Sequence, residues 1–213
     1  MHICKATGRP LGLVEINSLT IDRKKDLNDF SIPKPTVCLS LTSTLFYMIK
    51  ATELADIDEE WVESAIEVSY QEDGPKKCRI IPRPGLTQLL VELERYCSPM
   101  IYSSESDQFI DAALLALSIA QGDPEQDDCS LEAGAYMGHC VWSMHQCVPT
   151  ELGYKKSLGT LSEFTESGIN DIWIIDHNPQ QVDIPSRVLT VPKFSGDLSD
   201  RALFKLMDQI FIN

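Results

Sequence analysis

The chain has 213 residues, 43% of them hydrophobic, which is enough for one domain with an ordinary core. Its formal net charge is -14. Neutralising a phosphate backbone requires clustered Lys and Arg, so direct binding of nucleic acid is disfavoured. The seven cysteines include no C-x-x-C pair, which argues against a disulfide framework and indicates an intracellular, reducing compartment.

The beginning of the chain carries little periodic pattern. We expect an irregular lead-in over residues 1–34 and a single domain over residues 35–213. The basic residues Lys5 and Arg9 are too few to define a targeting signal, which leaves the mitochondrion and the nucleus both open. The apolar run at 109–120 is too short to cross a bilayer, so no membrane span is expected.

The first part of the predicted domain combines a strand, a hairpin and a helix. Residues 36–41 form a short apolar run that predicts a buried strand. The β-prone pieces at 67–70 and 78–81 flank turn-forming residues and predict a small β insertion at about residues 61–82. Apolar residues then recur at helical spacing over residues 86–97.

Strands and helices alternate in the rest of the chain. The same patterns predict a strand at 100–103, a helix over 107–120, a helix over 158–166, strands at 171–176 and 188–191, and a last helix from Ser199. Repeated βα units indicate an α/β fold with a doubly wound, mostly parallel sheet. Because the ligand crevice of such a sheet lies at the carboxyl ends of its strands, the residues just after each strand are the candidates for a site.

Six segments of the chain, in this order, resemble one known family. They are residues 36–45, 83–86, 101–105, 153–158, 174–179 and 194–200. The set is similar to the RNA polymerase C-terminal-domain phosphatase group of the haloacid dehalogenase (HAD) superfamily, and the resemblance covers residues 36 to 212. It implies a HAD-like Rossmannoid fold. The same family includes the mitochondrial presequence-translocase receptor subunit, whose branch the segment Tyr102-Ser103-Ser104-Glu105 resembles.

The resemblance also implies that the catalytic positions are altered. Family members place two aspartates at the end of the first strand, one as nucleophile and metal ligand and one as general acid/base; here the matching residues are Ser40 and Thr42. The third metal position corresponds to His177. Phosphoryl transfer of this type needs an ionised oxygen nucleophile beside a hard cation, and magnesium prefers oxygen ligands. We therefore expect no catalytic residues, no magnesium site and no cofactor.

The phosphate-binding half of the family's pocket is retained. Lys156 matches the lysine that pairs with the transferred phosphoryl group, Ser103 its hydroxyl donor, and Asp176 the acid of the fourth motif. These features favour a catalytically inactive phosphatase-like domain that binds other protein subunits as a scaffold or assembly subunit. The alternatives are a phosphopeptide sensor using the remnant pocket and a weak, atypical phosphoprotein phosphatase. Lys156 and Asp176 could also persist only as an ion pair.

Three further patterns carry weaker alternatives. Ser40 and His177 could form a nucleophilic pair, although no oxyanion hole or orienting acid is evident. Two His and two Cys within residues 139–147 could bind zinc by type, but their spacing fits no common module, so a structural role is favoured. Trp61 and Tyr70, near the hairpin, could form a docking surface or belong to the local core.

Overall fold

The structure is a computed structural model that describes residues 19–22, 34–50, 52, 63–121, 140–151, 153–165 and 167–212. Most of the lead-in over residues 1–34 lies outside this part of the chain. Within the lead-in, the strand β1 pairs in parallel with the C-terminal strand β12. The strands are β1 Ile21–Asp22, β2 Thr36–Leu39, β3 Phe46–Lys50, β4 Ile66–Gln71, β5 Pro75–Pro82, β6 Ser98–Tyr102, β7 Val141–Trp142, β8 Val148–Thr150, β9 Gly153–Lys155, β10 Ile172–Asp176, β11 Val188–Thr190 and β12 Phe211–Ile212.

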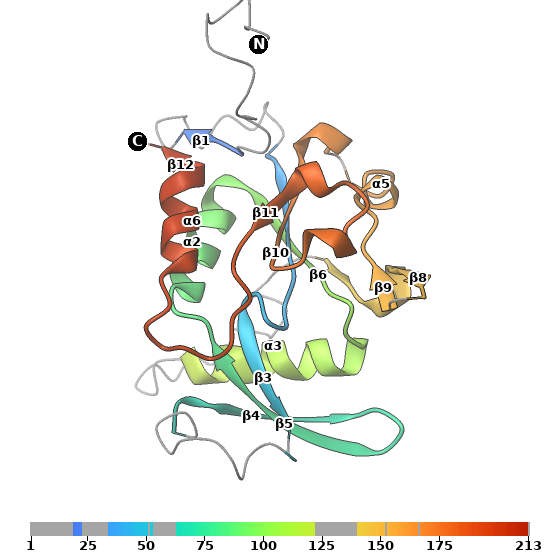
Figure 1. Ribbon diagram of the computed structural model, residues 1–213, viewed down its shortest axis with the longest axis vertical. Helices are drawn as coiled ribbons and strands as arrows, with labels where there is room; N and C mark the ends of the chain where they lie inside the picture. Colours follow the sequence, from blue (N-terminus) through green and yellow to red (C-terminus); the bar gives the residue numbers. More distant parts are fainter. Residues whose placement is uncertain are drawn as a thin grey trace, which may run out of the picture.

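The central sheet is parallel throughout. Its five strands lie in the order β11-β10-β2-β6-β7, and every neighbouring pair is parallel. The α-helices are α2 Leu86–Tyr96, α3 Asp107–Gln121, α5 Leu158–Leu161 and α6 Ala202–Ile210 (Figure 1). The predicted α/β fold with a mostly parallel sheet is therefore confirmed.

The alternation of side chains along the buried strands produces a core on each face of this sheet. Val37 and Leu39 of β2 face a large cluster that includes residues of α2, α3 and α6. Cys38 faces the opposite side, where the short helix α5 contributes Leu158 and Leu161. Strands covered on both faces are expected to be almost continuously apolar, which explains why residues 36–41 read as a buried strand.

The predicted hairpin belongs to a larger antiparallel sheet. Strands β4 and β5 form the hairpin, and β3 pairs with the other edge of β5 to give the order β3-β5-β4 (Figure 1). The strand β3 is not among the elements predicted from the sequence. The insertion thus begins immediately after the first strand of the central sheet and lies beside its carboxyl end.

Two predicted helices differ from the structure in length. The helix expected over 158–166 ends at Leu161, and turns follow it. The last helix begins at Ala202 rather than Ser199, because Asp197 accepts hydrogen bonds from the backbone and side chain of Ser199 in a local turn. Asp200 then accepts a bond from the Ala202 N–H at the start of the helix. Among the described helices, none combines the length and hydrophobicity that crossing a bilayer requires.

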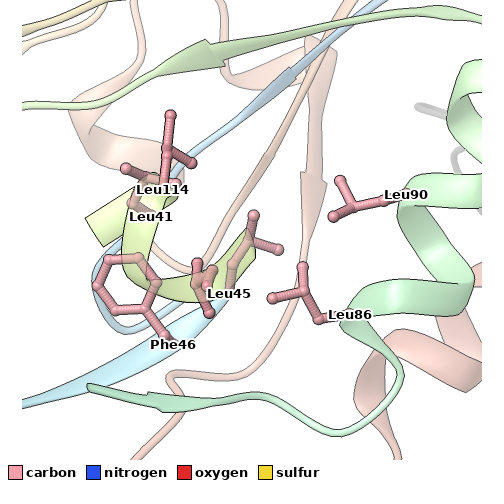
Figure 2. A pocket seen from close by; sticks show the side chains of 7 residues that line it. Leu41, Leu45, Phe46, Leu86, Leu90 and Leu114 are labelled. Carbon is pink, nitrogen blue, oxygen red and sulfur yellow. The ribbon is translucent and has the colours of Figure 1, made fainter. Parts of the chain in front are cut away.

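A small apolar gap separates the β2–β3 turn from the helices that cover it (Figure 2). Its volume is about 10 Å³. The residues lining it are Leu41, Leu45, Phe46, Leu86, Leu90, Leu114 and Leu117. An apolar space of this size is at the lower limit for one water molecule and offers it no polar partner, so the gap is part of the core.

Gly85 fixes the start of α2 and yields a stability prediction. Its φ is +88°, and a Cβ added there would lie 3.1 Å from the Phe204 ring. Gly85→Ala should therefore combine backbone strain with a steric clash and cost about 2–3 kcal/mol in the free energy of unfolding. Gly74→Ala is the matched control, since its φ of +122° leaves the added Cβ without neighbours. Equal losses in urea denaturation of the two variants would contradict the steric part of this prediction.

Candidate functional site

The candidate site lies at the carboxyl ends of the central strands. Ser40 directly follows β2, and its N–H donates to the carbonyl of Ile175 on the neighbouring strand β10. Asp176 is the last residue of β10, and Ser103 follows β6. These three positions meet because the strands are parallel and adjacent, as the sequence predicts.

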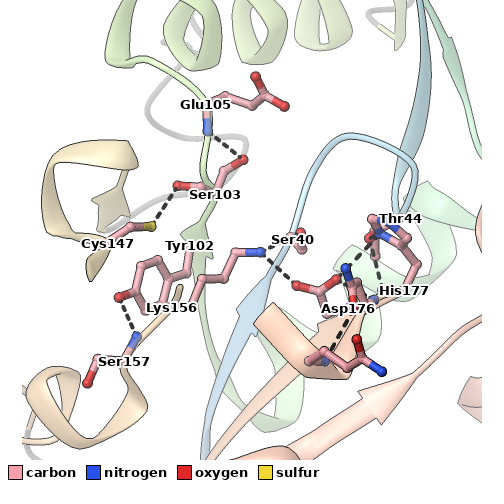
Figure 3. A network of polar contacts seen from close by, with 12 residues as sticks. Ser40, Thr44, Tyr102, Ser103, Glu105, Cys147, Lys156, Ser157, Asp176 and His177 are labelled. Carbon is pink, nitrogen blue, oxygen red and sulfur yellow. Dashed lines mark hydrogen bonds and ion pairs between the residues drawn. The ribbon is translucent and has the colours of Figure 1, made fainter. Parts of the chain in front are cut away.

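Lys156 reaches this edge from a different part of the fold and is bonded within it (Figure 3). Its Nζ donates to Asp176 Oδ2 at 2.7 Å and to Ser40 Oγ at 3.1 Å. The exposed fractions of the side chains are 2% for Lys156 and 0% for Asp176. The predicted lysine, acid and altered nucleophile position therefore form one buried, hydrogen-bonded group with one positive and one negative charge.

Backbone and aromatic contacts fix Lys156 in this position. Its N–H donates to Gln181 O at 2.8 Å, and its carbonyl accepts from Asp183 N at 2.9 Å. The next residue, Ser157, donates its N–H to the hydroxyl of the buried Tyr102 at 2.8 Å. These bonds hold the backbone of Lys156 against the central sheet, and this fixes the position of its ammonium group in the site.

His177 bonds to Thr44 and not to Ser40. The Nδ1 of His177 lies 2.9 Å from Thr44 Oγ1, and its backbone N–H donates to the same hydroxyl oxygen at 3.2 Å. Because Ser40 accepts its hydrogen bond from Lys156, the described geometry does not form the Ser-His nucleophilic pair considered from the sequence. Thr44 is the residue that holds the imidazole, a contact that the sequence alone does not predict.

The environment of His177 disfavours its charged form. Burial lowers the pKa of His177 below its ordinary value of 6.5, and the positive charges of Lys156, Lys193 and Arg83 lower it further, while Asp176 opposes them. The folded protein therefore binds fewer protons at this position than the unfolded chain does over the interval between the two pKa values. By linkage, stability falls as the pH is lowered through 6.5 and recovers as it is raised.

This linkage can be measured. We expect the free energy of unfolding, determined by urea titration, to decrease between pH 7.5 and pH 5. This decrease should be smaller in His177→Asn than in the wild-type chain. His145→Asn is the control, because its side chain is 62% exposed. An unchanged pH profile in His177→Asn would show that the imidazole does not carry the effect.

The other two predicted site residues take less part in the bonded group. Ser103 is 2% exposed, and its hydroxyl accepts a bond from the Glu105 N–H at 3.4 Å. Its carbonyl accepts a long bond of 3.7 Å from the Cys147 thiol. The hydroxyl oxygen of Thr42 is buried without a hydrogen-bond partner in the described structure. A role for Ser103 in binding phosphate therefore stays a prediction, as does the loss of the catalytic function at Thr42.

The donor set does not fit a magnesium ion. Ser40 and Thr42 offer neutral hydroxyl groups and His177 offers an imidazole, whereas magnesium demands octahedral oxygen ligands, usually including carboxylates. The Lys156 ammonium also lies 3.1 Å from Ser40 Oγ, where it opposes a second cation. In the part of the chain described, no three His, Cys, Asp or Glu side chains gather as a possible metal site.

Cys147 and Tyr70 belong to the zinc and docking alternatives, and both have defined contacts in the structure. Cys147 is buried and donates to the carbonyls of Ser103 and Ser143, which supports the structural role favoured for it. Tyr70 packs edge to face against Phe109, with ring centroids 5.3 Å apart. His139 and Trp61 lie outside the described residues.

Arg83 connects the site to the last helix. Its side chain is fully buried; its Nε and Nη2 donate to the two carboxylate oxygens of Asp200 at 3.0 and 2.9 Å. Its Nη1 donates to the carbonyl of Thr44 at 3.0 Å, and the guanidinium lies over the Phe194 ring. Arg83 and Asp200 lie in two separate segments of the family resemblance, 83–86 and 194–200. Nothing in their spacing indicates the contact, because 116 residues lie between them in the chain.

Solved structures with a similar fold include two of one phosphatase. One is described as Fcp1, an essential RNA polymerase II CTD phosphatase; it shares 17% sequence identity, and the TM-score is 0.55. The other is the fission yeast RNA polymerase II CTD phosphatase Fcp1-R271A bound to beryllium fluoride, with 18% identity and a TM-score of 0.55. Each alignment covers 76% of this chain and 42% of the other, so the chain spans less than half the length of these proteins.

Sequence comparison gives the family. Comparison with curated proteins finds no significant match. Residues 35–211, however, match the family described as NLI interacting factor-like phosphatase. The match includes Ser40, Lys156, Asp176 and His177, and the structural neighbours have the same HAD-like fold. The chain therefore belongs to the NLI interacting factor-like phosphatase family.

Proposed function

We propose that this chain is a catalytically silent member of its family and serves as a protein-binding subunit of a larger assembly. The observation that carries the proposal is the hydrogen bond from the Lys156 ammonium to Ser40 Oγ. A serine nucleophile must give its proton to a base, whereas the partner of this hydroxyl is an ammonium group that donates a hydrogen bond to it. Among the described residues, the imidazole of His177 lies beside the group, with its Nδ1 2.9 Å from Thr44 Oγ1 and 3.4 Å from Asp176 Oδ1, and it makes no hydrogen bond to Ser40.

The same geometry weighs against the phosphopeptide sensor. An incoming phosphate would have to reach Lys156, whose exposed fraction is 2%, and compete with the carboxylate of Asp176 at 2.7 Å. It would also bring negative charge beside that buried carboxylate, which is costly in a desolvated site. The sensor predicts phosphate-dependent binding of a phosphopeptide that is lost in Lys156→Ala, and calorimetry can test this directly.

Activity assays test the proposal itself. We expect the wild-type chain to hydrolyse neither a chromogenic phosphate monoester nor a phosphoserine peptide above the buffer rate, with or without Mg²⁺. The triple variant Ser40→Asp, Thr42→Asp, His177→Asn should gain magnesium-dependent turnover, because it restores carboxylate and amide oxygens. The control is a second triple variant that makes the same changes at exposed positions, Ser195→Asp, Thr190→Asp, His145→Asn. It should stay inactive. Magnesium-dependent turnover by the wild-type chain would overturn the proposal in favour of an atypical phosphatase.

The compartment and partner belong to the same proposal. We propose an intracellular, reducing location, which is supported by the free state of the described cysteines Cys38, Cys78, Cys97, Cys140 and Cys147. The partners are expected to be other protein subunits. A pull-down from the source cell, with identification of the chains that co-purify, would name them.

A further inference from the structure

The strand β1 is held to the rest of the fold by a short contact. Its two residues, Ile21 and Asp22, pair in parallel with Phe211 and Ile212 of β12 (Figure 1). Among the described strands, β1 and β12 pair only with each other, and neither belongs to the five-stranded central sheet. The pairing of β1 can therefore be exchanged without breaking any hydrogen bond of the central sheet.

Two apolar side chains anchor this segment to the core. Leu19 and Ile21 are 7% and 8% exposed and belong to the large cluster that also contains Tyr96 and Phe211, whereas Thr20 between them is exposed. This alternation is that of an extended chain with one face on the protein. The segment 19–22 therefore lies on the domain as an extended peptide would lie on a receptor.

The surface beneath the segment is built by other elements. We define it by Tyr96, the last residue of α2, and Phe211, which directly follows α6. Their ring centroids are 5.8 Å apart, so the two aromatic side chains support each other. This receiving surface is therefore formed by helices and a strand outside the lead-in.

The segment 19–22 gains little net stability from its contacts. Burying one leucine and one isoleucine is favourable, but ordering the backbone of four residues costs a free energy of the same order. By contrast, all four residues of β2 are buried, and β2 pairs with a strand on each side. Contacts as short as that of β1 open locally without global unfolding. We therefore expect residues 19–22 to detach while the central sheet stays folded.

We propose that the receiving surface is a docking site for an extended segment of a partner protein, which displaces residues 19–22 and carries apolar side chains two residues apart. The proposal rests on the proposed function as a protein-binding subunit and gives the chemistry of the partner. The seated Leu19-Thr20-Ile21 shows which chemistry fits: hydrogen bonds to β12 supply affinity, and the alternate apolar side chains select the segment. Because β1 competes for the surface, the partner's apparent affinity is reduced by the fraction of time that the surface is free.

The test uses a labelled peptide with the sequence of residues 17–24 as its probe. The full chain with Leu19→Ser, Ile21→Ser loses both anchors of β1, and we expect it to bind the peptide at least about tenfold more tightly than the wild type in fluorescence anisotropy. The matched control Val91→Ser, Leu198→Ser removes two exposed apolar side chains and should bind like the wild type. A peptide with serine at both apolar positions should bind to none of these chains.

A second measurement needs no variant. An excess of the peptide should speed hydrogen exchange within residues 19–22 of the wild-type chain and leave the amides of β2 unchanged. Unchanged exchange within residues 19–22, or equal peptide binding by both double variants, would overturn the proposal. A wild-type dimer that Leu19→Ser, Ile21→Ser converts to a monomer would assign the surface to a second copy, and would also overturn it.

Turnover assays on the same preparation keep the two proposals apart. Hydrolysis of a phosphate monoester by the wild-type chain contradicts the proposed function but does not change the occupancy of the receiving surface. Failure of the peptide to bind contradicts only the docking site.

Discussion

Replacing Lys156 by methionine should lower the free energy of unfolding by about 3–5 kcal/mol. The substitution keeps most of the volume of the side chain but removes the ammonium that lies 2.7 Å from Asp176. Asp176, whose exposed fraction is 0%, then keeps only the Asn178 N–H and the His177 imidazole at its other oxygen, and Ser40 loses a donor. For a chain of this length, the thermal midpoint should fall by roughly 10 °C or more.

Two further variants separate lost charge from lost packing. Lys155→Met changes the preceding residue, which is only partly buried, and should cost less than about 1 kcal/mol. Adding Asp176→Asn to Lys156→Met removes the unpaired charge and should recover part of the loss. Additive losses in the double variant, or a single-variant loss below about 1 kcal/mol, would show that the ion pair is not what holds the site together.

Arg83→Leu should have an effect of similar size, about 3–4 kcal/mol. Arg83 is fully buried and makes three hydrogen bonds, two to Asp200 and one to the carbonyl of Thr44. Its removal leaves the acid and the carbonyl without these donors. Because Thr44 also holds His177, the loss should loosen the site as well as the start of α6.

The control for this variant is Arg95→Leu, since Arg95 is exposed on α2. We expect that change to stay within about 0.5 kcal/mol of the wild type in urea denaturation. Arg83→Lys keeps the charge but not the paired geometry, so it should recover only part of the loss. Full recovery by lysine would mean that charge alone, without the two parallel bonds to Asp200, accounts for the effect.

The sequence predicts the central sheet well because its physical signal is strong. Strands β2 and β10 are buried on both faces and are almost continuously apolar, so each is evident as a run. The short strands β8 and β9 are exposed or half-buried, and neither is among the predicted strands. Such strands are set by their pairing with each other, which periodicity does not report.

The residues of the candidate site can be predicted from the sequence, but the hydrogen bonds between them cannot. The ends of parallel strands bring Ser40 and Asp176 together, and the family resemblance adds Lys156. That Lys156 donates to both residues depends on the path of the chain from β9, which Tyr102 and Asp183 fix through contacts distant in sequence. The role of Thr44 was missed for the same reason, since its imidazole partner lies 133 positions away.

The pairing of β1 with β12 has a mechanical consequence. Ile21 lies opposite Phe211 and Asp22 opposite Ile212, and the two strands run in the same direction. When the chain is pulled from the residues before β1 and after β12, parallel strands are drawn past each other, so the hydrogen bonds between them are loaded together in shear. The same contact joins positions about 190 residues apart, and closing so long a loop is entropically costly until the intervening fold has formed. In a force experiment we therefore expect β1 to resist as a unit, detach in one step, and reattach only while the rest of the domain stays folded.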